Sequence, residues 1–273
     1  MSDYLAAVLL GAIQAVTEFL PVSSSGHLLL GAQLFDSDAG SLTFSIGLHF
    51  GSLIAVLLFF RRDWCEIALA SSRDMRQQRI ALARWSAEGQ VGLLLVVATV
   101  PAVVAGAAFG TSIEQQLRAP WLVATNLIGF GLILGVADKR PVHYIDVRQT
   151  RLRHAFIVGM AQALAVVPGV SRSGVTFSAG RGLGFDRTAA TRLSFLMSAP
   201  VILAAALYEG RTVIAGSGSL RLGPMLAGAL VSAVLGILAM RWLMRYVESH
   251  SIQLFVWYRV GLGLLILSIY AFA

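Results

Sequence analysis

QAVTEFLPVSSSGHLLL, from Gln14 to Leu30, places a glutamine, a glutamate, three serines and a histidine in an otherwise apolar segment. Polar and ionisable side chains are costly inside a membrane, so such a run indicates a functional site rather than a lipid-facing surface. A second stretch, QALAVVPGVSRSGVTF from Gln162 to Phe177, resembles the first. Each has a proline break followed by a segment rich in serine and glycine. The position of these two stretches in the chain decides the predicted fold.

The composition predicts an integral membrane protein. Of the 273 residues, 57% are hydrophobic and 13% are charged. Soluble domains carry about 25% charged residues, so this chain has too few polar groups to cover a water-exposed surface. Its apolar runs lack the alternation of a membrane β-barrel, which leaves an all-α polytopic membrane protein. The lone Cys65 excludes an internal disulfide and a cysteine metal cluster.

Six apolar runs are long enough, or nearly so, to cross the hydrocarbon as helices. They are Thr43–Phe60, Val91–Gly110, Trp121–Ala137, Leu193–Tyr208, Leu222–Leu243 and Leu254–Ala273. Two further apolar regions, Met1–Phe35 and Ala155–Gly184, are interrupted at Pro21 and at Pro168–Gly169. Each half of these regions is too short to span. The sequence therefore predicts six spanning helices and two re-entrant helical hairpins.

The net charge of +7 is interpreted as a signal of topology and not as a nucleic-acid site. Basic residues are concentrated in four places: the loop Arg61–Gln90, the loop Asp138–His154, the segment Arg181–Arg192, and Arg241 with Arg245. The positive-inside rule places all four on the cytoplasmic side. The first hairpin then enters from outside and the second from inside. Non-helical backbone at that depth is tolerated where it lines a cavity within the protein.

The two hairpins belong to an internal repeat at an offset of 148 residues. Between positions 11 and 26 the identities are Gly11, Gln14, Ala15, Val22, Ser23, Ser25 and Gly26, which match Gly159, Gln162, Ala163, Val170, Ser171, Ser173 and Gly174. Residues 1–273 are predicted to form a single membrane domain, with one half at about 1–137 and the other at about 155–273. Opposite orientations make this an inverted repeat, whose site is expected near the midplane where the interrupted segments meet.

The two halves differ at positions that matter chemically. Glu18 aligns with Val166, Ser24 with Arg172, and His27 with Val175. The first hairpin thus holds a carboxylate, a hydroxyl and an imidazole, whereas the second holds a guanidinium. The segments Ser23–Gly26 and Ser171–Gly174 would each begin a helix, and free N–H groups at a helix N-terminus bind anions.

Structural alternatives exist for each of these residues. A buried arginine such as Arg172 can be satisfied by backbone carbonyls, and membrane serines often serve helix packing. His27 alone would suit a buried structural histidine, but its place beside the serine cluster favours a functional one. His49 and Arg259 carry less weight, because each stands alone in a spanning run. Arg259 in particular is long enough to reach the cytoplasmic interface.

The motifs EFLPVSSSGHL and PGVSRSGVTFSAGRGLGFDRTAATRLSFLMSAP resemble the two signature regions of the undecaprenyl pyrophosphate phosphatase family, also called bacitracin-resistance proteins. The resemblance extends from Gln14 to about Arg259. It implies hydrolysis of a C55 polyisoprenyl diphosphate to the monophosphate, which recycles the lipid carrier of cell-wall synthesis. It also implies a multi-pass protein of the bacterial cytoplasmic (inner) membrane with its cleft facing outside. A divalent cation, Mg²⁺ or Ca²⁺, with Glu18 as ligand, is implied as well.

These considerations predict a mechanism. Ser24 is the expected nucleophile with Glu18 as its base, and His27 is the rival nucleophile or the acid for the leaving group. Arg172 is expected to clamp the phosphate in a bidentate manner. The remaining substrate-binding candidates are Gln14, Ser23, Ser25, Gly26, Ser171, Ser173, Gly174 and Thr176.

The main alternative function is a transporter or flippase for polyprenyl phosphates, because inverted repeats with broken helices are a transporter design. A transporter has no need of a nucleophile, a base and an arginine gathered in one site, which favours the phosphatase. The expected partners are the polyprenyl diphosphate substrate and membrane lipid, and a homodimer is left open.

Overall fold

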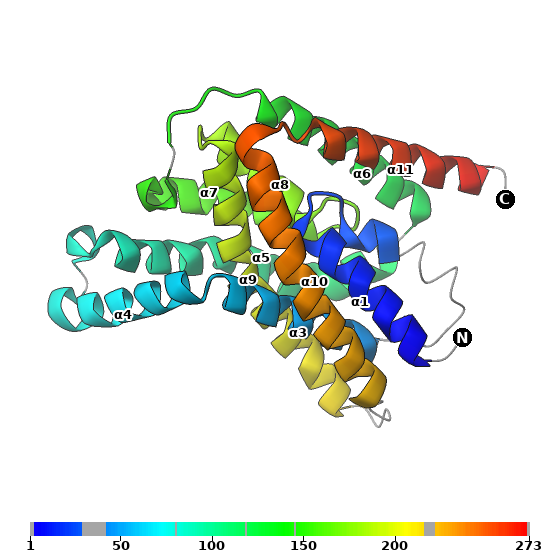
Figure 1. Ribbon diagram of the computed structural model, residues 1–273, viewed down its shortest axis with the longest axis horizontal. Helices are drawn as coiled ribbons and strands as arrows, with labels where there is room; N and C mark the ends of the chain where they lie inside the picture. Colours follow the sequence, from blue (N-terminus) through cyan, green and yellow to red (C-terminus); the bar gives the residue numbers. More distant parts are fainter. Residues whose placement is uncertain are drawn as a thin grey trace.

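The computed structural model describes residues 3–28, 42–79, 81–117, 119–144, 146–215 and 222–271 (Figure 1). Five helices within these ranges are long and apolar enough to cross a membrane: α5 (Ala87–Gln116), α6 (Pro120–Asp138), α9 (Arg187–Ala215), α10 (Leu222–Ser249) and α11 (Gln253–Ala271). In the same ranges, β-structure is limited to one isolated bridge between Tyr144 and Phe185. The chain is therefore an all-α polytopic membrane protein, as the composition predicts.

The sixth predicted span corresponds to α3 (Leu42–Phe59). The apolar part of this helix whose side chains are described, Gly47–Phe59, is shorter than a full crossing. The number of spanning helices therefore stays a prediction.

Each predicted hairpin is built around a break in the helix. In the first, α1 (Asp3–Phe19) ends shortly before Pro21, and a short helical segment follows over residues 24–28. The rest of this hairpin, as far as the predicted boundary at Phe35, lies outside the described residues. In the second, α7 (Leu152–Ala163) and the 3₁₀ turn η4 (Leu164–Val166) precede the break, and α8 (Arg172–Gly182) follows it. The re-entrant character of both hairpins, like the two repeat halves, stays a prediction.

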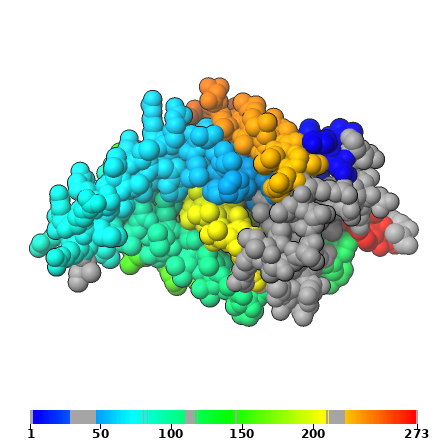
Figure 2. All heavy atoms as spheres, turned by 90° about the horizontal axis from the view of Figure 1, so that it is seen from below, coloured from blue at the N-terminus to red at the C-terminus, as the bar shows by residue number. Residues whose placement is uncertain are grey.

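Most of the described part of the connection Arg61–Gln90 is helical, so its interpretation as a loop was wrong. It contains α4 (Arg61–Gln78) and the 3₁₀ turn η2 (Leu82–Arg84), and α4 packs along the first part of α5. Ile67, Ala70 and Asp74 form the buried face of α4. High polarity excludes a segment from lipid but does not prevent an amphipathic helix that packs on a neighbour. α4 forms an arm at one end of the molecule (Figures 1 and 2).

The first limb of each hairpin packs closely on a long helix from the other part of the chain. α1 lies against α10, and α7 lies against α5. A Cβ added at Gly11 would lie 2.6 Å from the carbonyl oxygen of Gly228, and one at Gly159 would lie 2.6 Å from that of Ala98. Gly11 and Gly159 are equivalent positions of the sequence repeat, and only glycine permits these approaches of backbone to backbone.

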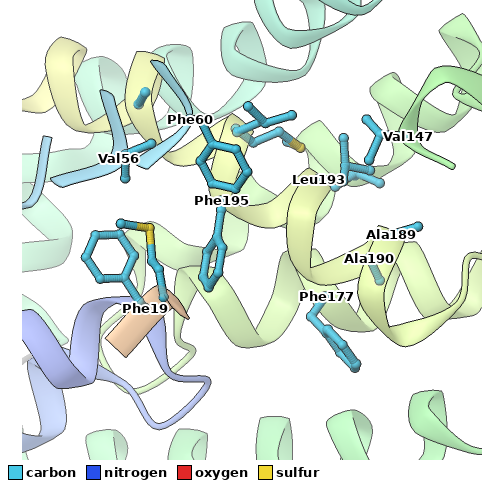
Figure 3. Packing of buried hydrophobic residues seen from close by; sticks show 14 of the residues in the cluster. Phe19, Val56, Phe60, Val147, Phe177, Ala189, Ala190, Leu193 and Phe195 are labelled. Atoms are coloured by element: carbon cyan, nitrogen blue, oxygen red, sulfur yellow. The ribbon is translucent and has the colours of Figure 1, made fainter. Parts of the chain in front are cut away.

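A cluster of aromatic side chains fixes the end of α1. The ring of Phe195 on α9 lies edge-on to that of Phe19, with centroids 5.8 Å apart, and 6.3 Å from the ring centroid of Phe60 (Figure 3). Phe19 follows Glu18 in the chain, and Phe195 follows Ser194. The packing therefore sets α1 and α9 in register beside the polar residues of the two breaks.

Candidate active site

The two breaks share an unusual backbone conformation. Ser23 has φ of 74° and Ser171 has φ of 73°, a left-handed conformation that residues other than glycine seldom adopt. Both serines directly precede a helical segment, which begins at residue 24 in the first hairpin and at Arg172 in the second. The Ser171 hydroxyl caps α8 by accepting a hydrogen bond from the N–H of Gly174 at 3.2 Å. Strained backbone of this kind clusters at functional sites, where the surrounding structure holds it in place.

Glu18 lies at the centre of the polar contacts between the two hairpins. Its Oε2 accepts hydrogen bonds from Oγ of Ser24 at 3.1 Å and from Nε2 of Gln14 at 3.2 Å. Its Oε1 accepts from Arg172, at 3.1 Å from Nη2 and at 3.4 Å from Nε. His49 of α3 adds an electrostatic interaction with this carboxylate. The structure thus brings together three of the four predicted catalytic residues and the predicted neighbour Gln14.

Arg172 reaches Glu18 from the other half of the chain, 154 positions away. The side chains of this ion pair are each 10% exposed. The third nitrogen, Nη1, donates to the carbonyl oxygen of Ser194 at 3.2 Å. Guanidinium groups present several donors in a fixed plane, which suits both a carboxylate and a phosphate. Arg172 is therefore directed at the point where Glu18 and Ser24 meet.

Two of the predicted substrate-binding serines join the hairpins to each other. The backbone N–H of Gly169 donates to Oγ of Ser25 at 3.0 Å. Oγ of Ser173 donates to the carbonyl oxygen of Leu20 at 2.9 Å. Each bond links a residue of one break to a residue of the other, so the two breaks form one polar junction.

The other predicted substrate-binding residues are buried or packed against neighbouring parts of the protein. Ser23, Ser171 and Thr176 are all buried. Oγ1 of Thr176 lies 2.6 Å from Oγ of Ser194 on α9 and donates to the carbonyl oxygen of Arg172 at 2.7 Å. Gly26 packs against α6, where an added Cβ would lie 3.1 Å from a methyl group of Leu127. The side chains of Ser24, Ser25 and His27 are half-buried, as are those of Glu18 and Arg172, so the junction is partly accessible at these residues.

His27 lies beside the cluster and not within it. Its Nδ1 lies 2.7 Å from the carbonyl oxygen of Ser23, and its Nε2 lies 2.6 Å from the hydroxyl of Tyr258. A carbonyl oxygen only accepts, so Nδ1 must carry a proton. In the neutral ring Nε2 then accepts from Tyr258, whose ring is stacked parallel to the imidazole. His27 is therefore connected to Ser24 through the backbone at Ser23.

Sequence reasoning gave too little weight to Arg259. The expectation that it extends toward the cytoplasmic interface was wrong, because the residue is fully buried and donates to carbonyl oxygens of both breaks. A charged residue in an apolar span is by default a functional candidate, and this was the signal available. Tyr258 and Ser194 carried no comparable signal, since a tyrosine or a serine in a membrane helix is common.

Comparison with known proteins agrees with the motifs. The family model described as bacitracin resistance protein BacA matches residues 7–265. The chain is 41% identical over 263 residues to the undecaprenyl-diphosphatase of Nocardioides sp., covering 96% of this chain and 95% of the relative. It is 41% identical over 262 residues to that of Desulforudis audaxviator, covering 96% of each, and 38% identical over 273 residues to that of Pelobacter propionicus, covering 98% and 97%. The chain belongs to the bacitracin resistance protein BacA family.

Proposed function

We infer that this chain is an undecaprenyl-diphosphatase of the membrane, which hydrolyses undecaprenyl diphosphate to undecaprenyl phosphate and phosphate. The inference rests on one observation above the others. A carboxylate, Glu18, accepts a hydrogen bond from the hydroxyl of Ser24 and is paired with Arg172 of the opposite hairpin. A base, a nucleophile and a cation at one point are the groups that phosphoryl transfer requires. Relatives at about 40% identity over almost the whole chain carry the name of this activity.

In the mechanism that we propose, Ser24 Oγ attacks the terminal phosphorus and Glu18 takes the proton of the hydroxyl. The bond from that phosphorus to the bridging oxygen breaks, and undecaprenyl phosphate leaves. Water then releases phosphate from the serine, with Glu18 again moving the proton. Arg172 is directed to the phosphate oxygens and stabilises the charge that develops on them. The N–H groups that follow Ser23 and Ser171 add donors at the two helix starts.

A role for Mg²⁺ or Ca²⁺ is a separate proposal. Mg²⁺ is usually held by one or two carboxylates together with substrate phosphates. Glu18 offers one carboxylate here, and Oε1 of Gln14 is a buried acceptor that receives no hydrogen bond from the residues the structure describes. These two oxygens suit such an ion, which would neutralise charge on the diphosphate. Within the described ranges, no three acidic, histidine or cysteine side chains lie close enough together to hold a metal ion. Substrate oxygens would therefore have to complete the site.

The location of the reaction is also a proposal. The basic clusters of the sequence place Arg73, Arg148 and Arg187 on the cytoplasmic side. We assign the protein to the bacterial inner membrane. In this assignment the half-buried face at Ser24 and His27 opens to the outer side, and the prenyl chain of the substrate stays in lipid between helices. Light scattering of the purified protein in detergent tests for a homodimer, which the sequence leaves open.

The decisive experiment measures release of inorganic phosphate from undecaprenyl diphosphate by the purified chain in detergent, with and without a chelator. The Glu18→Gln variant, purified in the same way, reports any contaminating phosphatase. Turnover by the wild type and none by the variant supports the function. A detergent solution has no second compartment, so a protein that only transports polyprenyl phosphates would give no phosphate in either preparation.

A further inference from the structure

Arg259 is a fully buried cation without an anionic partner among the described residues. Of the side chains that the structure describes, it is the largest that is completely buried. Its Nε donates to the carbonyl oxygen of Leu127 at 3.2 Å. Its Nη1 donates to that of Pro21 at 3.3 Å, and its Nη2 to those of Gly169 and Val170 at 2.9 and 3.0 Å. A buried charge costs several kcal/mol unless its environment compensates it, so this arrangement requires a reason.

The acceptors of Arg259 show what the side chain does. Pro21 lies in the first break, Gly169 and Val170 lie in the second, and Leu127 lies on α6. One rigid group therefore ties both interrupted segments to each other and to a spanning helix. Both breaks need an external restraint, because Ser23 and Ser171 have a positive φ that residues other than glycine seldom adopt. The N–H of Gly169 donates to Oγ of Ser25, so the second break is held through its N–H side as well as through its carbonyl oxygens.

The charge of Arg259 also distinguishes it from the other polar groups of the junction. Arg172 is paired with Glu18, so together they contribute no net charge. Arg259 adds a positive charge directly beneath the first turn of α8, since a Cβ at Gly174 would lie 2.8 Å from its Nη1. A diphosphate carries several negative charges, and a preorganised cation in a water-poor site favours their binding.

We propose that Arg259 is a positioning residue for phosphoryl transfer: it holds the two hairpin breaks together so that Ser24 and Arg172 meet at Glu18, and its charge attracts the anionic headgroup. It acts through the backbone of the breaks, and its own donors remain on the carbonyl oxygens. This inference rests on the proposed phosphatase function. A change in the separation of the breaks would misplace the nucleophile relative to the phosphate clamp.

Substitution of Arg259 by lysine or by methionine separates its positioning of the two breaks from the attraction of its charge for the headgroup. Lysine keeps the charge but, as a compact ammonium, cannot bridge the carbonyl oxygens of three elements. Arg259→Lys should therefore lower kcat with little change in KM. A misplacement of about 1 Å costs about 100-fold in rate, which sets the expected loss. Arg259→Met removes the charge as well and should also raise KM.

Arg181 provides a matched control. It is 3% exposed and donates to the carbonyl oxygens of Phe185, Asp138 and Arg140, so it is also a buried arginine that binds backbone. Those contacts lie at the far end of α8, away from Glu18. Arg181→Lys should lower the melting temperature but leave kcat per folded molecule close to that of the wild type.

The experiment measures kcat and KM for farnesyl diphosphate, a short soluble substrate, with folded protein quantified by size exclusion. Turnover by the wild type tests the proposed function, and the ratio of variant to wild type tests the role of Arg259. A wild-type kcat in Arg259→Lys would overturn the proposal, as would an equal loss in Arg181→Lys. If Arg259→Lys does not fold, Arg259→Gln replaces it, because a glutamine amide has fewer N–H donors than a guanidinium and cannot bond the carbonyl oxygens of three elements. A wild-type kcat in Arg259→Gln would reject the positioning role.

Discussion

Oγ of Ser24 donates a hydrogen bond to Oε2 of Glu18 at 3.1 Å, so the hydroxyl after the first break and the carboxylate before it form one unit. A proton can pass directly between them when the hydroxyl attacks phosphorus. The same carboxylate is held from the other side by Arg172. This contact suggests that base and nucleophile depend on each other.

Glu18→Gln and Ser24→Ala should each lower kcat by about 100- to 10,000-fold, the usual range for loss of general base catalysis, with little change in KM. The double variant should be hardly less active than either single variant, because a base without its nucleophile has nothing to activate. Steady-state kinetics of the three variants test this. Losses that add would show that the two residues act independently and would favour His27 as nucleophile.

Arg172→Lys should lose most activity, even though it preserves the charge. Two nitrogens of Arg172 contact Glu18 and a third contacts the carbonyl oxygen of Ser194, and an ammonium cannot reproduce that planar arrangement. Arg192→Lys is the control, since Arg192 is an exposed arginine that pairs with Asp63. The measurement is kcat/KM for both variants. Near-normal turnover in Arg172→Lys would remove this residue from the phosphate site.

The contact between Glu18, Ser24 and Arg172 could be predicted from the sequence. The repeat aligned two breaks, and unlike residues at equivalent positions implied that the halves pool their chemistry. The contacts of Arg259 could not be predicted in this way, because its acceptors are backbone carbonyls and every residue has one. The helix α4 was missed for a different reason. Its buried face includes the charged Asp74, so its polarity resembles that of a loop.

The topology is tested by labelling single cysteines with an impermeant thiol reagent after Cys65, which is exposed, has been replaced by serine. Gln77 on α4 and Gln149 are predicted to be cytoplasmic, so cysteines there should not react from outside. Cysteines at Ser37 and Gly216, positions outside the described residues, should react. Labelling at Gln77 in intact cells would reverse the predicted orientation of the whole chain.

The arm formed by α4 should depend on pH through Asp74. The hydroxyl of Ser86 donates to Asp74 and, with the Ser86 N–H and Arg73, holds the pKa of this carboxyl below its ordinary value although burial opposes the shift. A lowered pKa in the folded state means stability that is present above the unfolded-state pKa and is lost as pH falls through the folded-state pKa. Ser86→Ala should therefore reduce the melting temperature at pH 7.

The difference between Ser86→Ala and the wild type should shrink as pH falls below the unfolded-state pKa of an aspartate, about 3.9, and should vanish once the folded wild type is also protonated at Asp74. Thermal unfolding at several pH values measures this, and kcat at pH 7 should not change. Ser72→Ala is the control, since the Ser72 hydroxyl is exposed and donates to the carbonyl oxygen of Leu69 on its own helix. Equal melting temperatures of Ser86→Ala and the wild type at pH 7 would show that the bond to Asp74 adds no stability.

Gln14 lies one helical turn before Glu18, and its amide nitrogen donates to that carboxylate at 3.2 Å. Gln14→Glu would place two carboxylates side by side, which repel each other unless a cation lies between them. The variant should therefore reach half-maximal activity at a lower Mg²⁺ concentration than the wild type, and it should lose more activity in a chelator. Gln162→Glu is the matched control, because Gln162 holds the equivalent repeat position but donates to the carbonyl oxygen of Ala98. Titration of Mg²⁺ against phosphate release compares the three proteins. An unchanged Mg²⁺ requirement in Gln14→Glu would place any essential cation away from Glu18, and the carboxylate would then serve Ser24 and Arg172 alone.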